Sequence, residues 1–309
     1  MLMKSTILLA MATDVWAQTQ YTSTASSAVA KAAATALTLS PTSKVAGQSF
    51  DRFVQIWLEN TDYSLAVGDT NLANLASKGI LLSNYFAITH PSQPNYVAAV
   101  GANTFGVTDD GFRRIGSSTK TIVDLLEAKG ISWGVYQEDM PYSGFEGNWV
   151  NQKTRANDYV RKHNPLMSYD SITSDINRLA KCKNFTMFDR DLANDKLPQW
   201  MFITPNMTND GHDTSVTTAG KWARNWLTPL LSNPNFNIAR TLIILTFDEG
   251  TIFGTNQVYA ALLGSAVPSA SVGTKNGTKY NHYSLTKTVE RNWNLGNLGQ
   301  NDVGASAFF

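Results

Sequence analysis

Cysteine and charge are both scarce in this sequence, and each shortage excludes several kinds of protein. Cys182 is the only cysteine among 309 residues, so the chain can form no internal disulfide. No cysteine pair is available for redox chemistry or for a zinc site, and we expect Cys182 to be a buried, unreactive thiol. Charged residues make up 16% of the chain and the net charge is +1. The sequence has no broad basic surface and no nucleic-acid-binding motif, so we expect no nucleic-acid partner.

An apolar run long enough to cross a bilayer is also missing, so we expect no integral membrane segment. The N-terminus instead has the pattern of a secretory signal peptide over residues 1–17. Lys4 precedes a short apolar run at residues 5–12, and residues 15–17 offer a cleavage site. A buried N-terminal helix is the alternative, but the polar residues after Ala17 disfavour it.

The composition changes after this segment. Residues 18–49 are rich in Ser, Thr and Ala and are predicted to form a flexible spacer, in which residues 28–36 have the composition of a short helix. A folded body is predicted over residues 50–309. Three Asn-X-Thr triplets in this body predict N-glycosylation at Asn184, Asn206 and Asn276. With the signal pattern, they predict a secreted protein located outside the cell or in the cell wall. The sequence does not decide the oligomeric state.

Apolar runs typical of buried strands alternate with helical patterns throughout the body. Because such alternation builds βαβ units, it predicts an α/β fold, a three-layer α/β/α sandwich around a mostly parallel sheet. Ligands of such sheets bind at the carboxyl ends of the strands. The predicted strands are residues 53–58, 132–136, 199–204, 241–247 and 258–263, and the predicted helices are residues 71–78, 95–100, 121–130, 171–181, 217–231 and 283–293.

Two of the predicted strands end in adjacent oxygen ligands. Glu59 and Asn60 follow the first strand, and Asp248 and Glu249 follow the strand at residues 241–247. Their oxygens suit Mg²⁺, Ca²⁺ or Mn²⁺, and carboxylates also bind Zn²⁺, so a divalent metal of undetermined identity is predicted. Solvated loops or helix caps are the alternative for either pair taken alone. Two pairs at two strand ends, with a serine turn between them in the chain, favour a metal site.

The serine turn spans residues 89–96 and places Ser92 just before a predicted helix. A divalent ion bound to the Ser92 oxygen would favour the alkoxide, so Ser92 is a candidate nucleophile and metal ligand that needs no catalytic triad. The alternative is that Ser92 only caps the helix that follows Pro94. Capping and phosphate binding are compatible, because a helix N-terminus presents free N–H groups to an anion.

Four histidines are candidates for acid–base or phosphate-binding roles. His90 lies two residues before Ser92, His212 lies in a loop rich in Asp and Asn, and His282 precedes the last predicted helix. A structural or surface role is the alternative for each of them. For His163, both kinds of role stay open.

In their order along the chain, these motifs resemble those of the phosphoesterases that include fungal and bacterial acid phosphatases and the non-haemolytic and plant phospholipases C. The resemblance spans residues 53–293 and implies an alkaline-phosphatase-like fold, with residues 50–309 as the phosphoesterase catalytic domain and a phosphoserine as intermediate. It implies catalytic roles for Ser92, His90, His212 and His282, metal ligation by Glu59, Asn60, Ser92, Asp248 and Glu249, and substrate binding by Asn95, Asp210 and His163. The motifs that support it are Glu59-Asn60, His90-Pro91-Ser92-Gln93-Pro94-Asn95, Asn209-Asp210-Gly211-His212-Asp213, Phe247-Asp248-Glu249-Gly250 and Asn281-His282-Tyr283-Ser284.

Three departures from the phospholipase pattern favour the compact secreted acid phosphatase branch. Thr61 follows Asn60 where phospholipases usually have a basic residue, plant phospholipases have Thr where this chain has Ser92, and the chain ends soon after Trp293. The predicted function is therefore metal-dependent hydrolysis of small phosphate monoesters. His212 or His282 is the expected proton donor to the leaving alcohol, because imidazole titrates in the useful pH range. Two alternatives stay open: a phospholipase C or other phosphodiesterase on the same scaffold, and a non-catalytic secreted glycoprotein that acts as a binding module. A sulfatase is disfavoured, because Cys182 does not lie in a sulfatase motif.

Overall fold

The computed structural model describes residues 16–17 and 25–309. The predicted signal peptide and the first part of the predicted spacer therefore lie almost wholly outside the described residues. Within this region, β1 (Trp16–Ala17) pairs antiparallel with β5 (Arg113–Arg114). No helix in the described part of the chain is both long enough and apolar enough to cross a membrane.

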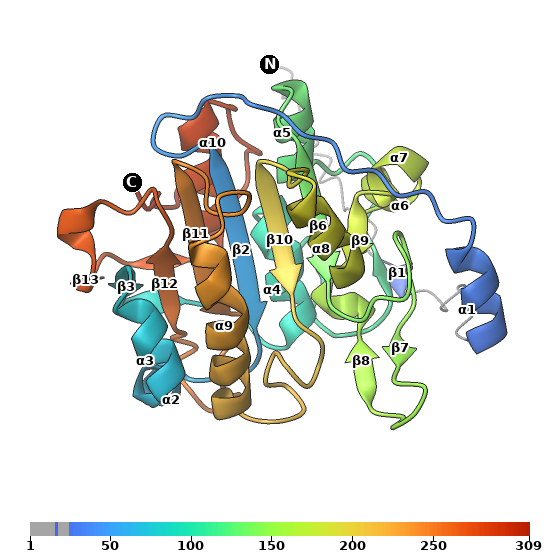
Figure 1. The fold of residues 1–309 in the computed structure, drawn as a ribbon, viewed down its shortest axis with the longest axis horizontal. Helices are drawn as coiled ribbons and strands as arrows, with labels where there is room; N and C mark the ends of the chain where they lie inside the picture. The colour runs from blue at the N-terminus through green and yellow to red at the C-terminus, as the bar shows by residue number, and fades with distance from the viewer. Residues whose placement is uncertain (1–15, 18–24) are drawn as a thin grey trace, which may run out of the picture.

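A central sheet of eight strands organises the molecule (Figure 1). β12 pairs antiparallel with both of its neighbours, and the other neighbouring strands of the sheet pair in parallel. The predicted α/β fold with a mostly parallel sheet is confirmed. In order across the sheet, the strands are β13 (Thr274–Asn276), β3 (Ile80–Leu82), β12 (Ala260–Leu263), β11 (Thr241–Phe247), β2 (Arg52–Leu58), β10 (Trp200–Thr204), β6 (Trp133–Gln137) and β9 (Cys182–Asn184).

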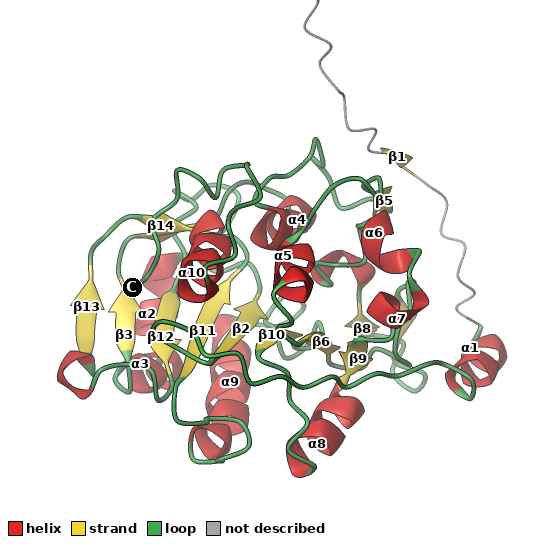
Figure 2. Cartoon of the chain, turned by 90° about the horizontal axis from the view of Figure 1, so that it is seen from above, coloured by secondary structure: helices red, strands yellow, loops and turns green. Residues whose placement is uncertain are grey.

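Helices cover both faces of this sheet and complete the three layers, as Figure 2 shows from above. One face carries α4 (Ser92–Gly101), α5 (Ile122–Ala128) and α10 (Tyr283–Trp293). The opposite face carries α2 (Tyr63–Gly68), α3 (Thr70–Ala76), α8 (Phe185–Ala193) and α9 (Val216–Leu231). The remaining described elements are α1 (Ser26–Ala33), β4 (Tyr85–Phe86), β7 (Trp149–Val150), β8 (Asn157–Tyr159), η1 (Arg161–His163), α6 (Asp170–Thr173), α7 (Ile176–Leu179), η2 (Ser269–Ser271) and β14 (Tyr280–Asn281).

The helix predicted over residues 171–181 is wrong in one respect, because the structure divides it into α6 and α7. Asp175 lies in extended conformation between them, and its side chain accepts hydrogen bonds from the backbone N–H groups of Asn177 and Arg178. A short acidic side chain that satisfies these donors starts a new helix more readily than it continues an old one.

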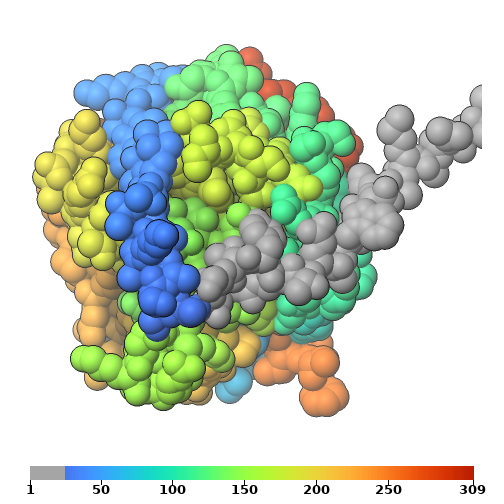
Figure 3. Space-filling model, turned by 90° about the vertical axis from the view of Figure 1, so that its right-hand side faces the viewer, coloured from blue at the N-terminus to red at the C-terminus, as the bar shows by residue number. Residues whose placement is uncertain are grey.

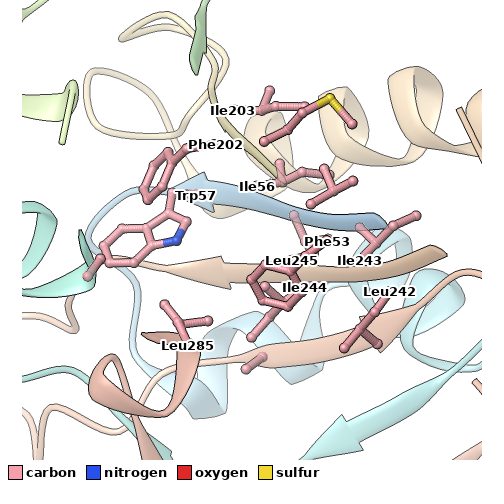
Figure 4. Packing of buried hydrophobic residues seen from close by; sticks show 14 of the residues in the cluster. Phe53, Ile56, Trp57, Phe202, Ile203, Leu242, Ile243, Ile244, Leu245 and Leu285 are labelled. Atoms are coloured by element: carbon pink, nitrogen blue, oxygen red, sulfur yellow. The ribbon is translucent and has the colours of Figure 1, made fainter. Parts of the chain in front are cut away.

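The core forms around the two central strands β2 and β11, which are buried along their whole length. Figure 4 shows side chains from β2, β10 and β11 packed together, with Leu285 of α10 in the same cluster. A strand covered on both faces needs apolar side chains at every position, which explains why these runs show no alternation with polar residues. The core therefore holds the carboxyl ends of β2, β10 and β11 side by side.

Residues 34–49, the later part of the predicted flexible spacer, run along the surface of the body. Figure 3 shows this segment in blue, crossing segments from the middle of the chain. Thr38 donates a hydrogen bond to Ser143 at 2.8 Å, Ser43 donates to Gln199 at 2.6 Å, and the Ser49 backbone N–H donates to Asn292 at 2.8 Å. The small hydroxyl side chains that suggested a free spacer are thus used as hydrogen-bonding groups, and the described part of the segment is held on the body.

Candidate active site

Three neighbouring strands, β11, β2 and β10, end at the same edge of the sheet and bring acidic side chains together. β11 pairs with β2 in a register that sets Phe247 opposite Leu58, so Asp248 and Glu59 leave the sheet side by side. The Asn60 backbone N–H donates to Asp248 Oδ1 at 3.1 Å. Asn60 has a φ of 50°, a left-handed conformation that asparagine tolerates better than most residues.

The loop after β10 adds Asp210 to this edge. The Glu59 backbone N–H donates to the Asp210 carbonyl at 2.9 Å, which joins the loop to the end of β2. Gly211 follows with a φ of +102°, and a Cβ there would lie 3.1 Å from the Ala219 Cβ in α9. A glycine at this position therefore lets the loop turn close to α9 and return toward Glu59.

Ser92 is the first residue of α4, and Pro91 is the N-cap. The hydroxyl Oγ lies 3.1 Å from Glu249 Oε1 and 3.3 Å from Glu59 Oε2. The alternative in which Ser92 only caps the helix is therefore wrong, because the hydroxyl faces the two carboxylates instead of the helix backbone. The helix also begins two residues before Pro94, so its N-terminus points the Ser92 side chain into the acidic group.

Burial makes the acidic group electrostatically unfavourable without a cation. Burial, and then the neighbouring Glu249, raises the pKa of Asp248 to about 7. Burial also raises the pKa of Glu249 to about 7 and the pKa values of Glu59 and Asp210 well above their usual range. Carboxylates whose negative charge is destabilised in this way are stabilised by a bound cation.

The donor atoms of the acidic group fit a divalent metal ion. Ligand atoms of Glu59, His163 and Asp210 all lie within 4.8 Å of one another. Burial keeps the pKa of His163 well below its usual value, so the imidazole is neutral and can ligate. Four buried atoms that could ligate a metal have no hydrogen-bond partner among the described residues: Asn60 Oδ1, Asp210 Oδ2, Asp248 Oδ2 and His163 Nε2. Unpartnered buried acceptors are rare, and a metal ion would satisfy them.

Tyr96, one turn after Ser92 in α4, was not identified from the sequence. Its hydroxyl donates a short hydrogen bond to Glu59 Oε1, and its ring stacks on His163 with centroids 5.1 Å apart. One side chain therefore positions two of the candidate metal ligands. The signal available in the sequence was the spacing of four residues from Ser92, which places Tyr96 on the same face of α4.

His90 and His212 lie at the partly exposed rim of the site. His90 Nδ1 is 2.5 Å from Glu249 Oε2, and His212 Nδ1 is 2.7 Å from Asp213 Oδ1. The rings of His212 and His163 have centroids 5.8 Å apart, so His212 lies beside the candidate metal ligands. With Nδ1 held by a carboxylate, each imidazole can present Nε2 to a substrate.

His282 is placed differently from its predicted role as a proton donor. It is fully buried, its Nε2 donates to the Asp248 carbonyl at 2.6 Å, and its Nδ1 accepts from the Tyr85 hydroxyl at 3.1 Å. Burial lowers the pKa of His282 to about 4. Both ring nitrogens are used by the protein, so the geometry supports a positioning role at the end of β11 and opposes direct proton transfer.

Asn95 also differs from its predicted role in substrate binding. Its Oδ1 accepts from the backbone N–H groups of Ile88 and Thr89, and its Nδ2 donates to the carbonyls of Thr89 and Pro91. These four hydrogen bonds use all the polar capacity of the amide. Asn95 therefore holds the loop that carries His90 and has no group left for a substrate.

Lys162 and Asp110 were also missed by the sequence reasoning. Lys162 Nζ lies 2.7 Å from Asp110 Oδ2, and Asp110 Oδ1 accepts from the Gln93 backbone N–H at 3.0 Å. The Lys162 charge opposes the effect of burial on the pKa values of Glu59 and Glu249. Its sequence signal was adjacency to His163, but nothing in the sequence showed that η1 would pack against α4.

The predicted glycosylation sites are half-buried and hydrogen-bonded. In each case the side-chain amide nitrogen donates a hydrogen bond: Asn184 to the Met140 carbonyl, Asn206 to the Asp139 carboxylate and Asn276 to the Tyr280 hydroxyl. Each of these nitrogens carries two hydrogens, and a glycan replaces only one of them, so the remaining N–H can keep the existing contact. Cys182 is fully buried, and burial raises its pKa to about 12, as an unreactive thiol requires.

Comparison with solved structures defines the class of fold. The structure matches the crystal structure of a protein in the alkaline phosphatase superfamily from Vibrio parahaemolyticus with a TM-score of 0.53 and 11% identity. The match covers 90% of this chain and 78% of that chain. At this identity the likeness shows the fold, and the predicted alkaline-phosphatase-like fold is confirmed.

Comparison of sequences then defines the family. The model of the Phosphoesterase family matches residues 40–296, and the chain belongs to this family. It is 53% identical over 302 residues to an acid phosphatase of Aspergillus fumigatus, covering 97% of this chain and 67% of the relative. It is 27% identical over 254 residues to a phosphatidylinositol-3-phosphatase of Mycobacterium tuberculosis, covering 81% of this chain and 79% of the relative. The chain spans about two thirds of the length of the fungal acid phosphatases that it matches.

Proposed function

We propose that this protein is a metal-dependent acid phosphatase that hydrolyses small phosphate monoesters through a phosphoserine. One observation supports this above the others: the Ser92 hydroxyl, at the N-terminus of α4, lies between Glu249 and Glu59 in a buried acidic group with unpartnered oxygens. The 53% identity to an acid phosphatase supports the same activity.

Glu59, Asn60, Asp248, Glu249 and Ser92 are the proposed metal ligands, and the position of His163 and Asp210 beside Glu59 adds these two to the donor set. A divalent ion bound there supplies positive charge to the serine oxygen and to the phosphoryl oxygens. The carboxylates of this set suit Mg²⁺, Ca²⁺ and Mn²⁺, and its imidazole suits Zn²⁺.

In the proposed reaction, Ser92 Oγ attacks phosphorus as its proton passes to Glu249, whose other oxygen is held by His90 at 2.5 Å. The 3.1 Å separation of Ser92 Oγ and Glu249 Oε1 is within the range for direct proton transfer. The N-terminus of α4 faces the phosphoryl oxygens and stabilises their negative charge.

His212 is the proposed proton donor to the leaving alcohol, because Asp213 orients its ring through Nδ1 and no hydrogen bond to its Nε2 is found within the described residues. The same nitrogen then accepts a proton from the water that hydrolyses the phosphoserine. His282, the other donor considered from the sequence, positions Asp248 instead.

Secretion remains part of the proposal. It rests on the signal pattern over residues 1–17 and on the three glycosylation triplets. Mass spectrometry of protein recovered from culture medium would test it: we expect an N-terminus after residue 17 and glycan on at least one of the three asparagines.

A phosphorylated lipid is the second candidate substrate. A pocket of about 340 Å³ beside Ser92 is lined by Asn60, His90, Glu249 and the loop 250–252. Ile252 in this loop is 72% exposed and the following Phe253 is 99% exposed. Exposed apolar side chains at the mouth of a polar site are compatible with a lipid leaving group.

The decisive experiment combines turnover with chemical labelling. Ser92→Ala should lower kcat by about 10⁴-fold or more at unchanged folding, and brief incubation with a ³²P-labelled monoester should label the wild type on Ser92 only. Ser269→Ala, an exposed serine in η2, is the matched control and should behave as the wild type. Near-normal turnover by Ser92→Ala would refute the nucleophile. No turnover of any phosphate ester by wild type with bound metal would favour the non-catalytic glycoprotein.

A further inference from the structure

A second pocket lies beside Ser92, on the side of α4 and η1. It has a volume of about 270 Å³ and is lined by Gln93, Asp110, Gly111, Phe112, Asn148, Val160, Arg161 and Lys162. Gly111 and Asn148 are exposed at its rim, whereas Gln93 and Arg161 are buried. The pocket is therefore open to solvent at one end and closed by α4 and η1 at the other.

Covalent connections and hydrogen bonds join this pocket to the reactive serine. Gln93 directly follows Ser92, and its backbone N–H donates to Asp110 at 3.0 Å. Lys162 directly precedes His163, whose Nε2 lies 3.4 Å from Glu59 Oε1. Gln93 and Lys162, which line this pocket, therefore connect it directly to the reactive serine and to the candidate metal ligands.

The polar groups of the pocket suit adjacent hydroxyl groups. Asp110 offers acceptor oxygens, and Lys162 offers ammonium N–H groups, one of which is used on Asp110 at 2.7 Å. A carboxylate beside an ammonium can accept from one hydroxyl while the ammonium donates to the next. Within the described residues, the buried Gln93 Nε2 has no hydrogen-bond partner, and a ligand oxygen in the pocket would supply one.

The charge and size of the pocket argue against two other ligands. Lys162 is paired with Asp110. The buried Arg161 guanidinium lies over the Phe112 ring at 3.9 Å and donates to the Arg113 carbonyl, and its Nε and Nη1 have no hydrogen-bond partner among the described residues. These two buried N–H groups can donate to ligand oxygens, as Gln93 Nε2 can. Among the described residues that line the pocket, Lys162 is paired and the other cation, Arg161, is buried, so neither presents an exposed, unpaired charge to a second phosphate. A volume of 270 Å³, which equals roughly nine water molecules at liquid density, is too small for a diacylglycerol.

We propose that the pocket between α4 and η1 binds the leaving alcohol and selects small, neutral, polyhydroxylated alcohols through the Asp110–Lys162 pair. The inference rests on the proposed phosphatase activity and adds the class of alcohol to it. It also assigns the alcohol to this polar pocket and not to the other pocket, which is lined by His90, Glu249 and Ile252.

The test compares two esters with the same carbon skeleton, glycerol 1-phosphate and propyl phosphate. The ratio of their kcat/KM values isolates the hydroxyl contacts, because both transfer the same phosphoryl group. Lys162→Met should lower this ratio about tenfold or more relative to the wild type. Asp110→Asn, which keeps an acceptor for the Gln93 N–H, should lower it in the same direction. In the double variant the ratio should fall no further than in Lys162→Met, because the pair acts as a unit.

Lys129→Met is the matched control, since Lys129 is exposed at the end of α5 and should leave the ratio unchanged. Equal losses for both esters in Lys162→Met would overturn the proposal, because Lys162 would then act on the phosphoryl group. An unchanged ratio in both single variants would also overturn it, as would a wild type that prefers decyl phosphate over glycerol 1-phosphate. In these cases hydrolysis persists, so they differ from failure of the proposed function, in which neither ester is hydrolysed.

Discussion

Two buried groups of charged side chains in this molecule have opposite electrostatic character. At the edge strand β9, Asp191 accepts from Lys183 Nζ at 2.6 Å and from the hydroxyls of Tyr136 and Ser40 at 2.8 Å each. This group, which we call the β9 ion pair, contains its own counter-charge. At the carboxyl end of the sheet, four carboxylates face one another with Lys162 nearby and with unpartnered oxygens on Asp210 and Asp248. The four are Glu59, Asp210, Asp248 and Glu249.

The difference separates structural burial from functional burial. A buried carboxylate with a cation and hydrogen-bond donors around it is complete, and removing one partner destabilises the fold. Buried carboxylates that repel one another cost stability and persist where a bound cation offsets the repulsion. Burial alone therefore does not mark a site, whereas four buried carboxylates gathered at one edge of the sheet, with unpartnered oxygens and a histidine beside them, do. Four changes would break or sharpen this contrast.

Asp248→Asn should have the largest effect on activity and little cost in stability. We expect kcat/KM to fall by about 10³-fold, because a charged metal ligand at the serine is lost. In metal-free protein the thermal midpoint should stay equal or rise, since repulsion with Glu249 is relieved. Chelation should lower the midpoint of the wild type and leave the variant unchanged. A variant that is destabilised without metal would show that Asp248 is structural.

Asp191→Ala should have the opposite pattern, with a large loss of stability and little change in activity. Loss of Asp191 leaves the buried Lys183 ammonium unpaired, which should lower the free energy of unfolding by about 3–5 kcal/mol. Denaturant unfolding measures this, and kcat/KM of the folded fraction should stay within about twofold. Asp189→Ala, at an exposed position of the same helix, is the control and should stay within about 0.5 kcal/mol. A loss of metal affinity in Asp191→Ala would contradict the separation of the two groups.

Tyr96→Phe should weaken the site by an intermediate amount. Removing the hydroxyl that holds Glu59 should lower metal affinity or kcat/KM by about 10- to 100-fold. Tyr169→Phe removes an equally buried hydroxyl, which donates to the Val97 carbonyl at 2.8 Å, and should leave metal affinity unchanged. Equal metal affinity in both variants, measured by titration calorimetry, would show that Tyr96 has no positioning role.

Glu290→Gln should give the smallest effect on activity, and its effect on stability should be visible only in the pH dependence. Burial, and then the neighbouring Asp302, raises the pKa of Glu290 to about 8, whereas an unfolded glutamate titrates near 4.3. Between these values the folded state binds the extra proton, so the wild type loses stability as pH rises. The variant should match the wild type near pH 5 and exceed its thermal midpoint near pH 9. A constant difference across this range would show that Glu290 does not titrate with folding.

Much of the fold followed from local patterns. The predicted strand at residues 241–247 became β11, and the predicted helix at residues 217–231 became α9 with one more residue at its start. A continuous apolar run and a helical apolar period both reflect burial directly. Short elements such as β3 and β9 were missed, since three residues carry too little pattern. Residues 34–49 were predicted to be a flexible spacer but are held on the body by hydrogen bonds such as that from Ser43 to Gln199. Local composition does not indicate such long-range hydrogen bonds.

By itself, the sequence determined which residues could do chemistry here: a serine beside a helix start, and oxygen ligands after two strands, in an order shared with the Phosphoesterase family. Only the tertiary structure decided which of these residues meet in the site and which form hydrogen bonds elsewhere in the protein. Parallel pairing of β11 with β2 sets Asp248 beside Glu59. The polar groups of Asn95 and His282, by contrast, form hydrogen bonds within the protein. Tyr96 and Lys162 join the site through packing of α4 against η1. Chemical type is a property of each residue, but its partners and its burial depend on contacts between segments far apart in the chain.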